Sequence, residues 1–373
     1  MQKLTKLLIL LLALVPFCFS QSTVPASRLA HIQHGINLSE WFAQVYDSRG
    51  YTKEHFQDWT TASDIALIKS AGFDHVRLSV NPEPIMKAGW RQGGIEEYIG
   101  YLDAAMKMIL DAGLAVELDM HPDGDFKAEL KDDAFVERYA DFWRHMAQHY
   151  ASWDPERVFF EIMNEPEMRD PYRWYGIEAK LASAIREAAP SHTILAAGAN
   201  WDDEDDMLLL EPLRDPNVIY VFHYYEPHIF THQGATWGDY YWRWLKQLHY
   251  PSNAENAAQV ASAVPEPLGR LHVIRYGQDH WDASRIEADV NQAADWAKRN
   301  GVPLVCNEFG AYRSFSDPQD RARWLTDVRT SLERHNIGWA MWDYSGGFSV
   351  VNKKDGKTTL DEVTMRALAL KMP

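Results

Sequence analysis

Apolar residues at helical spacing alternate along this chain with short runs of β-forming residues. The segments DIALIKSAGFDHVRLSV, YLDAAMKMILDAGLAVELDM, QAADWAKRNGVPLVCNEF and DVRTSLERHNIGWAMWDY share one order: an amphipathic run, a glycine or asparagine, then a β-rich run. Gly72, Gly113 and Gly301 can adopt the left-handed conformation that ends a helix. Ser284 with Glu287 has the spacing of a capping box that begins one. Each segment therefore predicts a helix followed by a strand, and such alternation favours a parallel sheet.

Eight segments carry the strand pattern, and their number predicts the fold class. Eight strands that alternate with helices favour an α/β protein with a (β/α)8 TIM barrel, elongated βα loops and a single domain over residues 21–373. A doubly wound open sheet is the alternative, although no G-x-G-x-x-G sequence follows the first strand. The longest irregular stretch, residues 224–283, is predicted to be an elaborated loop after strand six. The predicted strands span residues 32–37, 74–80, 114–120, 157–164, 192–198, 218–223, 302–308 and 337–343.

The first twenty residues differ from the rest of the chain. Lys3 and Lys6 precede an apolar run at residues 7–15, and small residues close the segment. This order is typical of a secretory signal peptide, and the apolar run is too short to span a bilayer. We therefore expect residues 1–20 to be removed and the protein to be secreted, either to the periplasm or to the extracellular space. An uncleaved anchor and a lipoprotein signal that retains Cys18 are the alternatives.

Composition and charge narrow the classes of function. The chain has 373 residues, of which 46% are hydrophobic and 13% aromatic, enough for one large core. Without residues 1–20 it carries 35 basic and 53 acidic side chains, a formal charge of −18, which argues against nucleic acid as a partner. Cys306 is then the remaining cysteine, so no intrachain disulfide is expected. No other apolar run reaches the length of a membrane span.

Polar and aromatic residues lie in the predicted strands or just beyond them. In a (β/α)8 barrel the carboxyl ends of the strands meet on one face, where active sites are built. Glu165 and Glu308 belong to strands four and seven, so both carboxylates can face one cleft. Such a pair suits glycoside cleavage, because one carboxyl gives a proton to the leaving oxygen while the other attacks the sugar or activates water. The set comprises His34, Asn37, Arg77, His121, Asn164, Glu165, Asn200, His223, Tyr225, Glu308 and Trp342.

Several motifs in this set occur together in a known family. NEP follows an apolar strand, NEFG occurs much later, and VRL, HYY with EPHIFTHQG, and WAMWDY lie on strands two, six and eight. In this order they resemble glycoside hydrolase family 5, the cellulase-like retaining β-glycanases on a (β/α)8 barrel. The resemblance runs from about His34 to the C-terminus, and it implies hydrolysis without a metal or other cofactor.

The resemblance also implies a role for each matching residue. Glu165 would be the acid/base, and Glu308 the nucleophile of a double displacement through a glycosyl-enzyme intermediate. Several relatives have two adjacent histidines after strand three, whereas Pro122 follows His121 here, which leaves the fine substrate preference open. Supporting roles are implied for Arg77 beside the nucleophile, Tyr225 as its hydrogen-bond donor, His223 beside the acid/base, Asn164 at the sugar 2-hydroxyl, Trp342 beneath the sugar and His121 in the conserved histidine position.

Aromatic residues outside the helix patterns add candidate sugar contacts. Trp41, Trp201 and Trp237 follow strand ends, and flat indole rings can cover the apolar faces of pyranoses. Asn37, at the end of the first predicted strand, is a further candidate for substrate binding. Cys306 lies two residues before the predicted nucleophile and is expected to pack on the same strand face.

These observations favour one function and leave others open. We predict a secreted, monomeric endo-β-1,4-glucanase, or cellulase, that acts on β-linked polysaccharide or oligosaccharide. β-Mannanase, xyloglucanase, mixed-linkage glucanase or exo-β-1,3-glucanase activity in the same site is the alternative. A non-catalytic polysaccharide-binding protein would be expected to lack one carboxylate. A barrel aldolase or other lyase would place a lysine or a metal triad at the strand ends. The sugar, the linkage and the mode of attack depend on loop shape.

Overall fold

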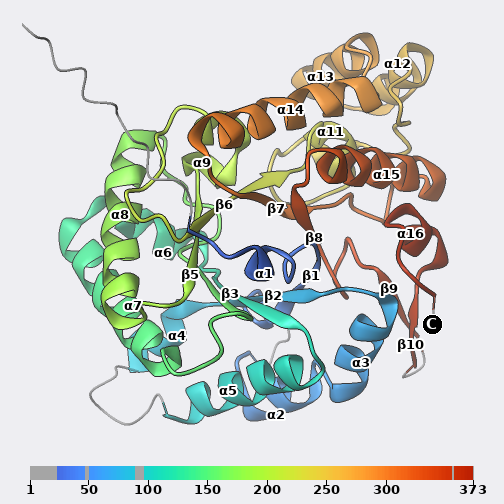
Figure 1. Ribbon diagram of the computed structural model, residues 1–373. Helices are drawn as coiled ribbons and strands as arrows, with labels where there is room; N and C mark the ends of the chain where they lie inside the picture. Colours follow the sequence, from blue (N-terminus) through green and yellow to red (C-terminus); the bar gives the residue numbers. More distant parts are fainter. Residues whose placement is uncertain (1–22, 47–49, 89–95, 355–356, 373) are drawn as a thin grey trace, which may run out of the picture.

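Eight parallel strands close into a barrel in sequence order (Figure 1). The computed structural model describes residues 23–46, 50–88, 96–354 and 357–372. The prediction of a single-domain (β/α)8 barrel is confirmed, because each strand pairs in parallel with the next and the first pairs with the eighth. The barrel strands are β1 (His34–Phe42), β2 (His75–Val80), β3 (Ala115–Met120), β4 (Val158–Glu161), β5 (Thr193–Ala197), β6 (Val218–Tyr224), β7 (Leu304–Phe309) and β8 (Gly338–Met341).

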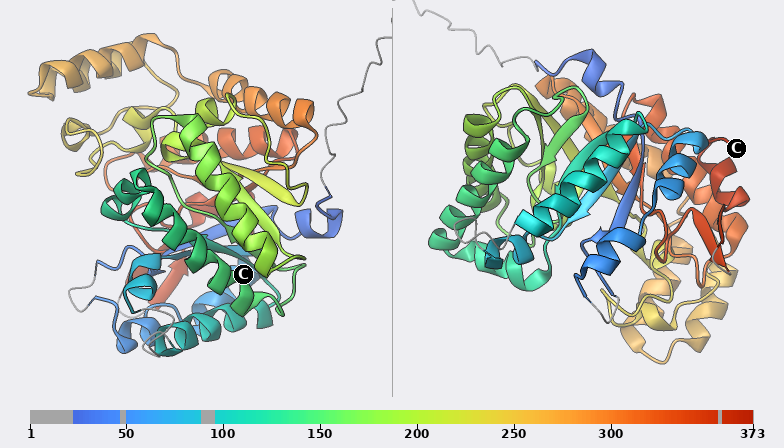
Figure 2. Two further views of the ribbon diagram at one scale, coloured as in Figure 1. Left: turned by 90° about the vertical axis from the view of Figure 1, so that its left-hand side faces the viewer. Right: turned by 90° about the horizontal axis from the view of Figure 1, so that it is seen from below.

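Helices surround the barrel and connect its successive strands (Figures 1 and 2). The predicted signal peptide, residues 1–20, lies outside the described residues. Within the part of the chain that the structure describes, no helix is both long enough and apolar enough to cross a membrane. The helices are α1 (Ala26–Leu29), α2 (Lys53–Asp58), α3 (Ala62–Ala71), α4 (Pro82–Ala88), α5 (Glu96–Asp111), α6 (Gly124–Ala128), η1 (Glu129–Lys131), α7 (Asp133–Tyr150), α8 (Pro171–Ala188), α9 (Ala199–Asp202), α10 (Glu204–Met207), α11 (His228–Thr231), η2 (Trp242–Trp244), α12 (Ala254–Ala263), α13 (Pro267–Gln278), α14 (Ala283–Asn300), α15 (Pro318–Arg334) and α16 (Glu362–Ala367), with a hairpin of β9 (Val351–Lys354) and β10 (Lys357–Leu360) after β8.

Side chains alternate along each strand and so build two different regions. Those that face the helices, such as Val76 and Phe160, belong to the main hydrophobic core. A second apolar cluster contains Ile32, which precedes β1, and Leu29 of α1 packs against it. Farther along the strands, inward positions carry charged groups instead. The interior of the barrel therefore changes from apolar to charged toward the carboxyl ends of the strands, where active sites lie in this fold. The buried charged residues of β2, β3 and β4 are Arg77, Glu117, Asp119 and Glu161.

The predicted helix stops are confirmed. Gly72, Gly113 and Gly301 have φ angles of 103°, 77° and 66°, in the left-handed region that favours glycine. Gly72 and Gly301 are the C-caps of α3 and α14. A residue with a Cβ atom would be strained at these positions, so the local chemistry of glycine ends the helices.

The predicted capping box at the start of α14 is wrong. The helix begins after Asp282, whose carboxylate accepts hydrogen bonds from the backbone N–H groups of Ser284 and Arg285. Glu287 instead accepts a hydrogen bond from Ser331 of α15 at 2.6 Å. An aspartate two residues before the serine therefore supplies the cap, and tertiary packing uses the glutamate elsewhere.

Two predicted strands, the first and the fourth, differ most from the observed ones at their carboxyl ends. β1 continues to Phe42, five residues past the predicted end, with an irregular register against β2 after Leu38. β4 ends at Glu161 rather than at residue 164. The backbone N–H of Asn164 nevertheless donates to the carbonyl of Met120 at 2.8 Å, so the chain stays beside β3 as far as the predicted end.

β7 contains an irregularity that changes which face its last residues occupy. Phe222 pairs with Cys306 but the next residue, His223, pairs with Glu308, so Asn307 is an extra residue on β7. Such a bulge reverses the alternation of side chains beyond it. Cys306 therefore packs in the core between strands and helices, whereas the side chain of Glu308 bonds Arg77 inside the barrel. The prediction that the two residues share a strand face is wrong for this reason.

The long segment after β6 is more ordered than predicted. Residues 224–283 contain α11, η2, α12 and α13 rather than an irregular loop. Gly277 lets α12 and α13 pack closely. A Cβ atom at this position would lie only 2.5 Å from the Cβ of Ala257. This helical pair projects from the barrel beside α14 (Figure 2). The prediction of one irregular loop over residues 224–283 is therefore wrong.

Candidate active site

Glu308 of β7 is a buried carboxylate with one donor for each of its oxygens. Arg77 Nη1 donates to Oε1 at 2.5 Å, and the Tyr225 hydroxyl donates to Oε2 at 2.8 Å. Arg77 lies on β2 and Tyr225 just after β6, so strands on different sides of the barrel hold the carboxylate. The two donors fix the orientation of the carboxylate at both of its oxygens.

Arg77 is itself held in a fixed position. Its Nε and Nη2 each donate to a Glu161 oxygen at 2.7 Å, and its Nη1 and Nη2 also donate to the amide oxygens of Asn37 and Asn164, both at 3.0 Å. The planar guanidinium suits this pattern, which a lysine could not reproduce. Asn37 donates in turn to the carbonyls of Asn307 and Met341. The structure thus places Asn37 behind Arg77, fully buried.

Glu165 lies on the other side of the site, directly after Asn164. Its φ angle is 47°, a left-handed conformation that is uncommon for a residue with a side chain. Its backbone N–H donates to Asp202 Oδ2 at 2.8 Å, and its Oε1 lies 3.1 Å from His223 Nδ1. The side chain is 28% exposed. Glu165, Glu308 and His223 each bring one polar atom within 4.8 Å of the others.

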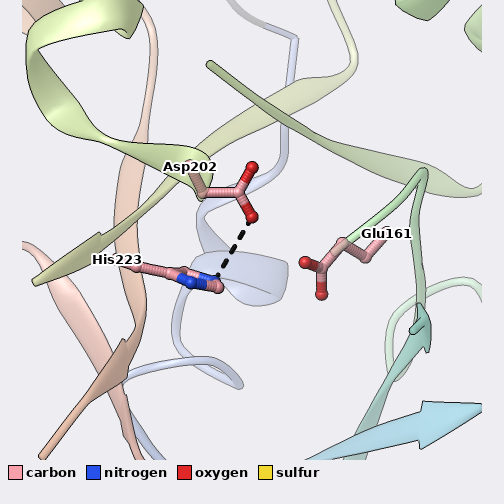
Figure 3. Close-up of side chains that lie close together, drawn as sticks. All are labelled: Glu161, Asp202 and His223. Carbon is pink, nitrogen blue, oxygen red and sulfur yellow. Dashed lines mark ion pairs between the residues drawn. The ribbon is translucent and has the colours of Figure 1, made fainter. Parts of the chain in front are cut away.

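His223 holds a proton between several carboxylates. Burial lowers its pKa, but Glu308, Asp202 and Glu165 outweigh burial and raise the pKa to about 9. Burial raises the pKa of Glu165, but the hydrogen bond and charge of His223 bring it below its ordinary value. In the free protein the proton of this pair therefore resides on the imidazole. Asp202 faces the Nε2 side of the ring at 3.4 Å (Figure 3).

His121 and Trp342 form a second side of the site. Their rings stack with centroids 5.6 Å apart and an interplanar angle of 15°. His121 Nδ1 lies 2.8 Å from Asp119 Oδ2, and its Nε2 lies 3.1 Å from Gln44 Nε2. Burial lowers the pKa of His121 to about 3, so the ring is neutral above that pH. A neutral imidazole paired with an aspartate can donate and accept hydrogen bonds without adding charge.

Comparison with known proteins places this arrangement in a family. Residues 38–347 match the model of Cellulase (glycosyl hydrolase family 5). The chain belongs to glycoside hydrolase family 5. Endoglucanase C of Acetivibrio thermocellus is 29% identical over 339 residues, which cover 88% of this chain and 96% of that protein. Endoglucanase 3 of Fibrobacter succinogenes is 28% identical, over 87% of this chain and 51% of that protein.

A solved structure agrees with this membership. Cel5A of Thermotoga maritima in complex with cellobiose has a TM-score of 0.72 and 25% sequence identity to this chain. The match covers 91% of this chain and 98% of that one. Members of glycoside hydrolase family 5 are glycoside hydrolases, so this chain is a glycoside hydrolase on a (β/α)8 barrel.

Aromatic residues extend the site of this glycoside hydrolase. Trp342 is 8% exposed and belongs to a cluster with Tyr225 and Phe348, against which Tyr312 packs. Trp237 is 48% exposed and meets the Tyr312 ring edge-on, with centroids 5.1 Å apart. An exposed indole thus continues the apolar surface that begins at Trp342.

Two of the other predicted tryptophan contacts have different outcomes. Trp201 is 52% exposed and lies within the left-handed turn that follows β5. Trp41 is only 2% exposed and donates from Nε1 to the carbonyl of Phe56, so the prediction of a sugar contact there is wrong. The extension of β1 by five residues carries this indole into the core. His34 opens β1 and pairs with Glu333 of α15, at the opposite end of the strand from the site.

Several site residues of this glycoside hydrolase were missed in the sequence. Glu117 and Asp119 precede His121 at intervals of two, a spacing that predicts one inward face of β3 and could have identified them. Asp202 lies in the acidic run DDEDD, which looks like a solvated surface. Nothing in that run distinguishes the buried aspartate from its neighbours.

Two triads have atoms of the kinds that bind metal ions. Glu161, Asp202 and His223 form one triad, and Glu165, His223 and Glu308 form the other. Both depend on His223, whose pKa of about 9 means that a proton occupies the ring at neutral pH. Arg77 already binds Glu161 and Glu308, and its fixed positive charge opposes a cation beside either carboxylate. This donor set suits a proton better than a metal ion.

Proposed function

We propose that this glycoside hydrolase is a retaining endo-β-1,4-glucanase that works by double displacement. The approach of the two carboxylates carries the proposal: an oxygen of Glu165 lies within 4.8 Å of an oxygen of Glu308. Retaining enzymes have carboxyl groups about 5 to 5.5 Å apart, whereas inverting enzymes need about 6.5 to 9.5 Å to admit a water molecule. The observed spacing supports direct attack by a carboxylate on the sugar.

The environments of the two carboxylates support different roles. Glu308, held by Arg77 and Tyr225, is the nucleophile that bonds to the anomeric carbon. Glu165 is the acid that protonates the leaving oxygen, and its proton comes across the 3.1 Å contact from His223. Glu165, then an anion, removes a proton from the water that hydrolyses the ester to Glu308. The ester neutralises Glu308, which removes the largest charge that holds a proton on His223.

The relatives and the aromatic surface support the substrate assignment. Two relatives that align over nearly nine tenths of this chain are named endoglucanases. The T. maritima structure contains cellobiose. Exposed indoles at Trp201 and Trp237 can cover the apolar faces of glucose units. We therefore propose β-1,4-glucan as the polymer and internal bonds as the point of attack.

Reducing-sugar release from β-1,4-glucan, mixed-linkage β-glucan and β-1,4-mannan tests this substrate. We expect activity on the glucans from the wild type and a loss of at least about 100-fold in Glu165→Gln, because general acid catalysis contributes that much. A rapid fall in the viscosity of carboxymethylcellulose would distinguish internal from terminal attack. Activity on mannan alone would replace glucan as the substrate.

Azide rescue tests the nucleophile. Glu308→Ala should lose turnover of an activated aryl β-cellobioside, and added azide should restore it by attacking in place of the carboxylate. Because this displacement occurs once, the product should be the α-cellobiosyl azide. In the matched variant Glu165→Ala, azide should instead attack the glycosyl-enzyme and give the β-azide. NMR of the anomeric proton distinguishes the products, and an exchange of the two outcomes would reverse the assignments.

We also propose that the protein is exported after removal of residues 1–20. The proposal rests on the charged, apolar and small-residue order of this segment. Mass spectrometry of the intact protein from the periplasmic and culture fractions of an expressing bacterial host tests it. A chain that begins near Gln21 is expected, and a full-length chain retained in the cytoplasm would contradict export.

A further inference from the structure

We propose that Asp202 is a positioning residue for Glu165, acting on its backbone directly and on its carboxyl group through His223. The inference rests on the proposed function, in which Glu165 is the acid/base. It assigns a role to a residue that does not contact the substrate.

The backbone around Asp202 has an unusual conformation. Asn200, Trp201 and Asp202 have φ angles of 61°, 68° and 57°, three consecutive residues in the left-handed region. Residues with a Cβ atom rarely adopt this conformation even singly, so a run of three persists where surrounding contacts compensate for it. The turn points the Trp201 indole outward, 52% exposed, and the Asp202 side chain inward, fully buried.

Hydrogen bonds join this turn to the segment that carries Glu165. The backbone N–H groups of Asn200 and Trp201 both donate to the carbonyl of Pro166, at 2.8 and 3.2 Å. In the reverse direction, the N–H of Glu165 donates to Asp202 Oδ2 at 2.8 Å. Glu165 has a left-handed backbone of its own, and these three bonds hold it there. Asp202 thus sets the direction in which the Glu165 side chain leaves the backbone.

The second contact of Asp202 is with His223. Asp202 Oδ2 lies 3.4 Å from His223 Nε2 (Figure 3), whereas Glu165 contacts the other ring nitrogen, Nδ1. Asp203, the next residue, forms a backbone bridge with His223, which keeps the turn against β6. Neither His223 Nε2 nor Asp202 Oδ1 has a hydrogen-bond partner among the described residues. Two unsatisfied polar atoms at full burial are costly unless they exchange a proton or tighten during the reaction.

The charges around His223 explain how Asp202 can act on Glu165. Glu165 Oε1 and Glu308 Oε2 lie 3.1 and 3.5 Å from Nδ1, and Asp202 lies against Nε2. Glu161 brings an oxygen within 4.8 Å of both Asp202 and His223, and it accepts a hydrogen bond from Arg77. Burial raises the pKa of Asp202 to about 8, within the range in which His223 titrates. Where Asp202 is ionised, its charge raises the pKa of His223 and so helps to retain the ring proton, and its contact with Nε2 leaves the Nδ1–H group facing Glu165.

Leaving-group dependence separates positioning of the acid from general disruption. Glu165 matters most when the leaving group needs a proton, as phenoxide does, and least for 2,4-dinitrophenolate. We expect Asp202→Ala to lower kcat/KM for phenyl β-cellobioside by about 100-fold, at the lower end of general acid contributions, and that for 2,4-dinitrophenyl β-cellobioside by less than about 3-fold. Equal losses on both substrates, or no loss on either, would overturn the proposal.

Two further variants, Glu165→Ala and Asp205→Ala, serve as controls for this result. Glu165→Ala should show the same leaving-group dependence, and its failure to do so would refute the proposed acid/base itself. If Glu165→Ala shows the dependence and Asp202→Ala does not, the inference alone fails. Asp205→Ala removes an exposed carboxylate from the same acidic run and should leave both substrates unaffected.

Asp202→Asn provides a second test, which remains available if the alanine variant does not fold. The asparagine oxygen can still accept the N–H of Glu165, but the amide cannot release a proton beside His223. We expect kcat/KM for the phenyl substrate to begin its alkaline decline at a pH about one unit lower than in the wild type, because His223 loses a stabilising charge. An unchanged alkaline limb in the folded asparagine variant would refute the action through His223.

Discussion

Each oxygen of Glu308 has its own donor, and the two donors belong to strands that are not neighbours in the barrel. For the reactivity of Glu308, the direction of these two hydrogen bonds matters more than their number. A carboxylate held at both oxygens keeps one lone pair directed at the anomeric carbon, and a displacement of about 1 Å can cost a hundredfold in rate. Tyr225 and the adjacent Tyr224 differ in this respect, because the hydroxyl of Tyr224 bonds Asp289 of α14 on the outside of the barrel.

This difference predicts opposite effects for the two tyrosines. Tyr225→Phe should lower kcat/KM at least about 10-fold, because Glu308 loses one of its two orienting bonds. Tyr224→Phe should leave kcat/KM unchanged within about 2-fold and lower the free energy of unfolding by about 1 kcal/mol, the net value of a typical hydrogen bond. Steady-state kinetics and urea denaturation of both variants measure these effects. Equal activity losses would show that the hydroxyl of Tyr225 has no special role.

At the scale of the elements, this barrel departs from a regular (β/α)8 barrel at the ends of its strands. The bulge at Asn307 turns Glu308 inward, and the left-handed turn after β5 turns Asp202 inward. Both irregularities lie at carboxyl ends of strands, where a side chain must be redirected toward the site. The helix caps are ordinary by contrast: Asp170, Asp282 and Asp317 are the N-caps of α8, α14 and α15.

The corrected cap of α14 leads to a stability prediction. Asp282→Ala should lower the free energy of unfolding by about 1 kcal/mol, because the N–H groups of Ser284 and Arg285 lose their acceptor. Ser284→Ala should change it by less than about 0.5 kcal/mol, as expected away from such features. Urea denaturation monitored by circular dichroism measures both. A larger loss in the serine variant would restore the capping box predicted from the sequence.

For the whole molecule, buried titratable groups set how stability depends on pH. The pKa values of Asp202 and His223 are about 8 and about 9 in the folded state, against ordinary values of about 3.9 and 6.5. Their contribution to stability is therefore present at low pH and lost as the pH rises through the folded values. For His121 burial lowers the pKa to about 3, so its contribution is present above pH about 6.5 and lost below it.

These opposing groups predict a maximum of stability near neutral pH. We expect Tm to be highest between pH about 5 and 7 and to fall toward pH 9 and toward pH 3. Differential scanning calorimetry at constant ionic strength measures the profile. Asp202→Asn should flatten the alkaline decline, because this side chain no longer loses a proton there. A wild-type Tm that rises steadily to pH 9 would contradict the raised pKa values.

The local sequence determined the repeating unit of this protein. Glycine stops, helical periodicity and β-rich runs act over a few residues, so eight strands and the closed barrel could be predicted without any long-range contact. The motifs around Glu165 and Glu308, at the ends of predicted strands four and seven, likewise placed the two carboxylates on one face of the molecule.

Only the tertiary structure decided the parts that depend on residues far apart in the chain. The burial of Trp41 follows from contact with Phe56, and the inward turn of Glu308 follows from the register between β6 and β7. Asp202 is one acid in an acidic run until the fold brings it against Glu165 and His223. Sequence periodicity reports which face a residue occupies, whereas the partner across the barrel is set by packing and register, which no short segment contains.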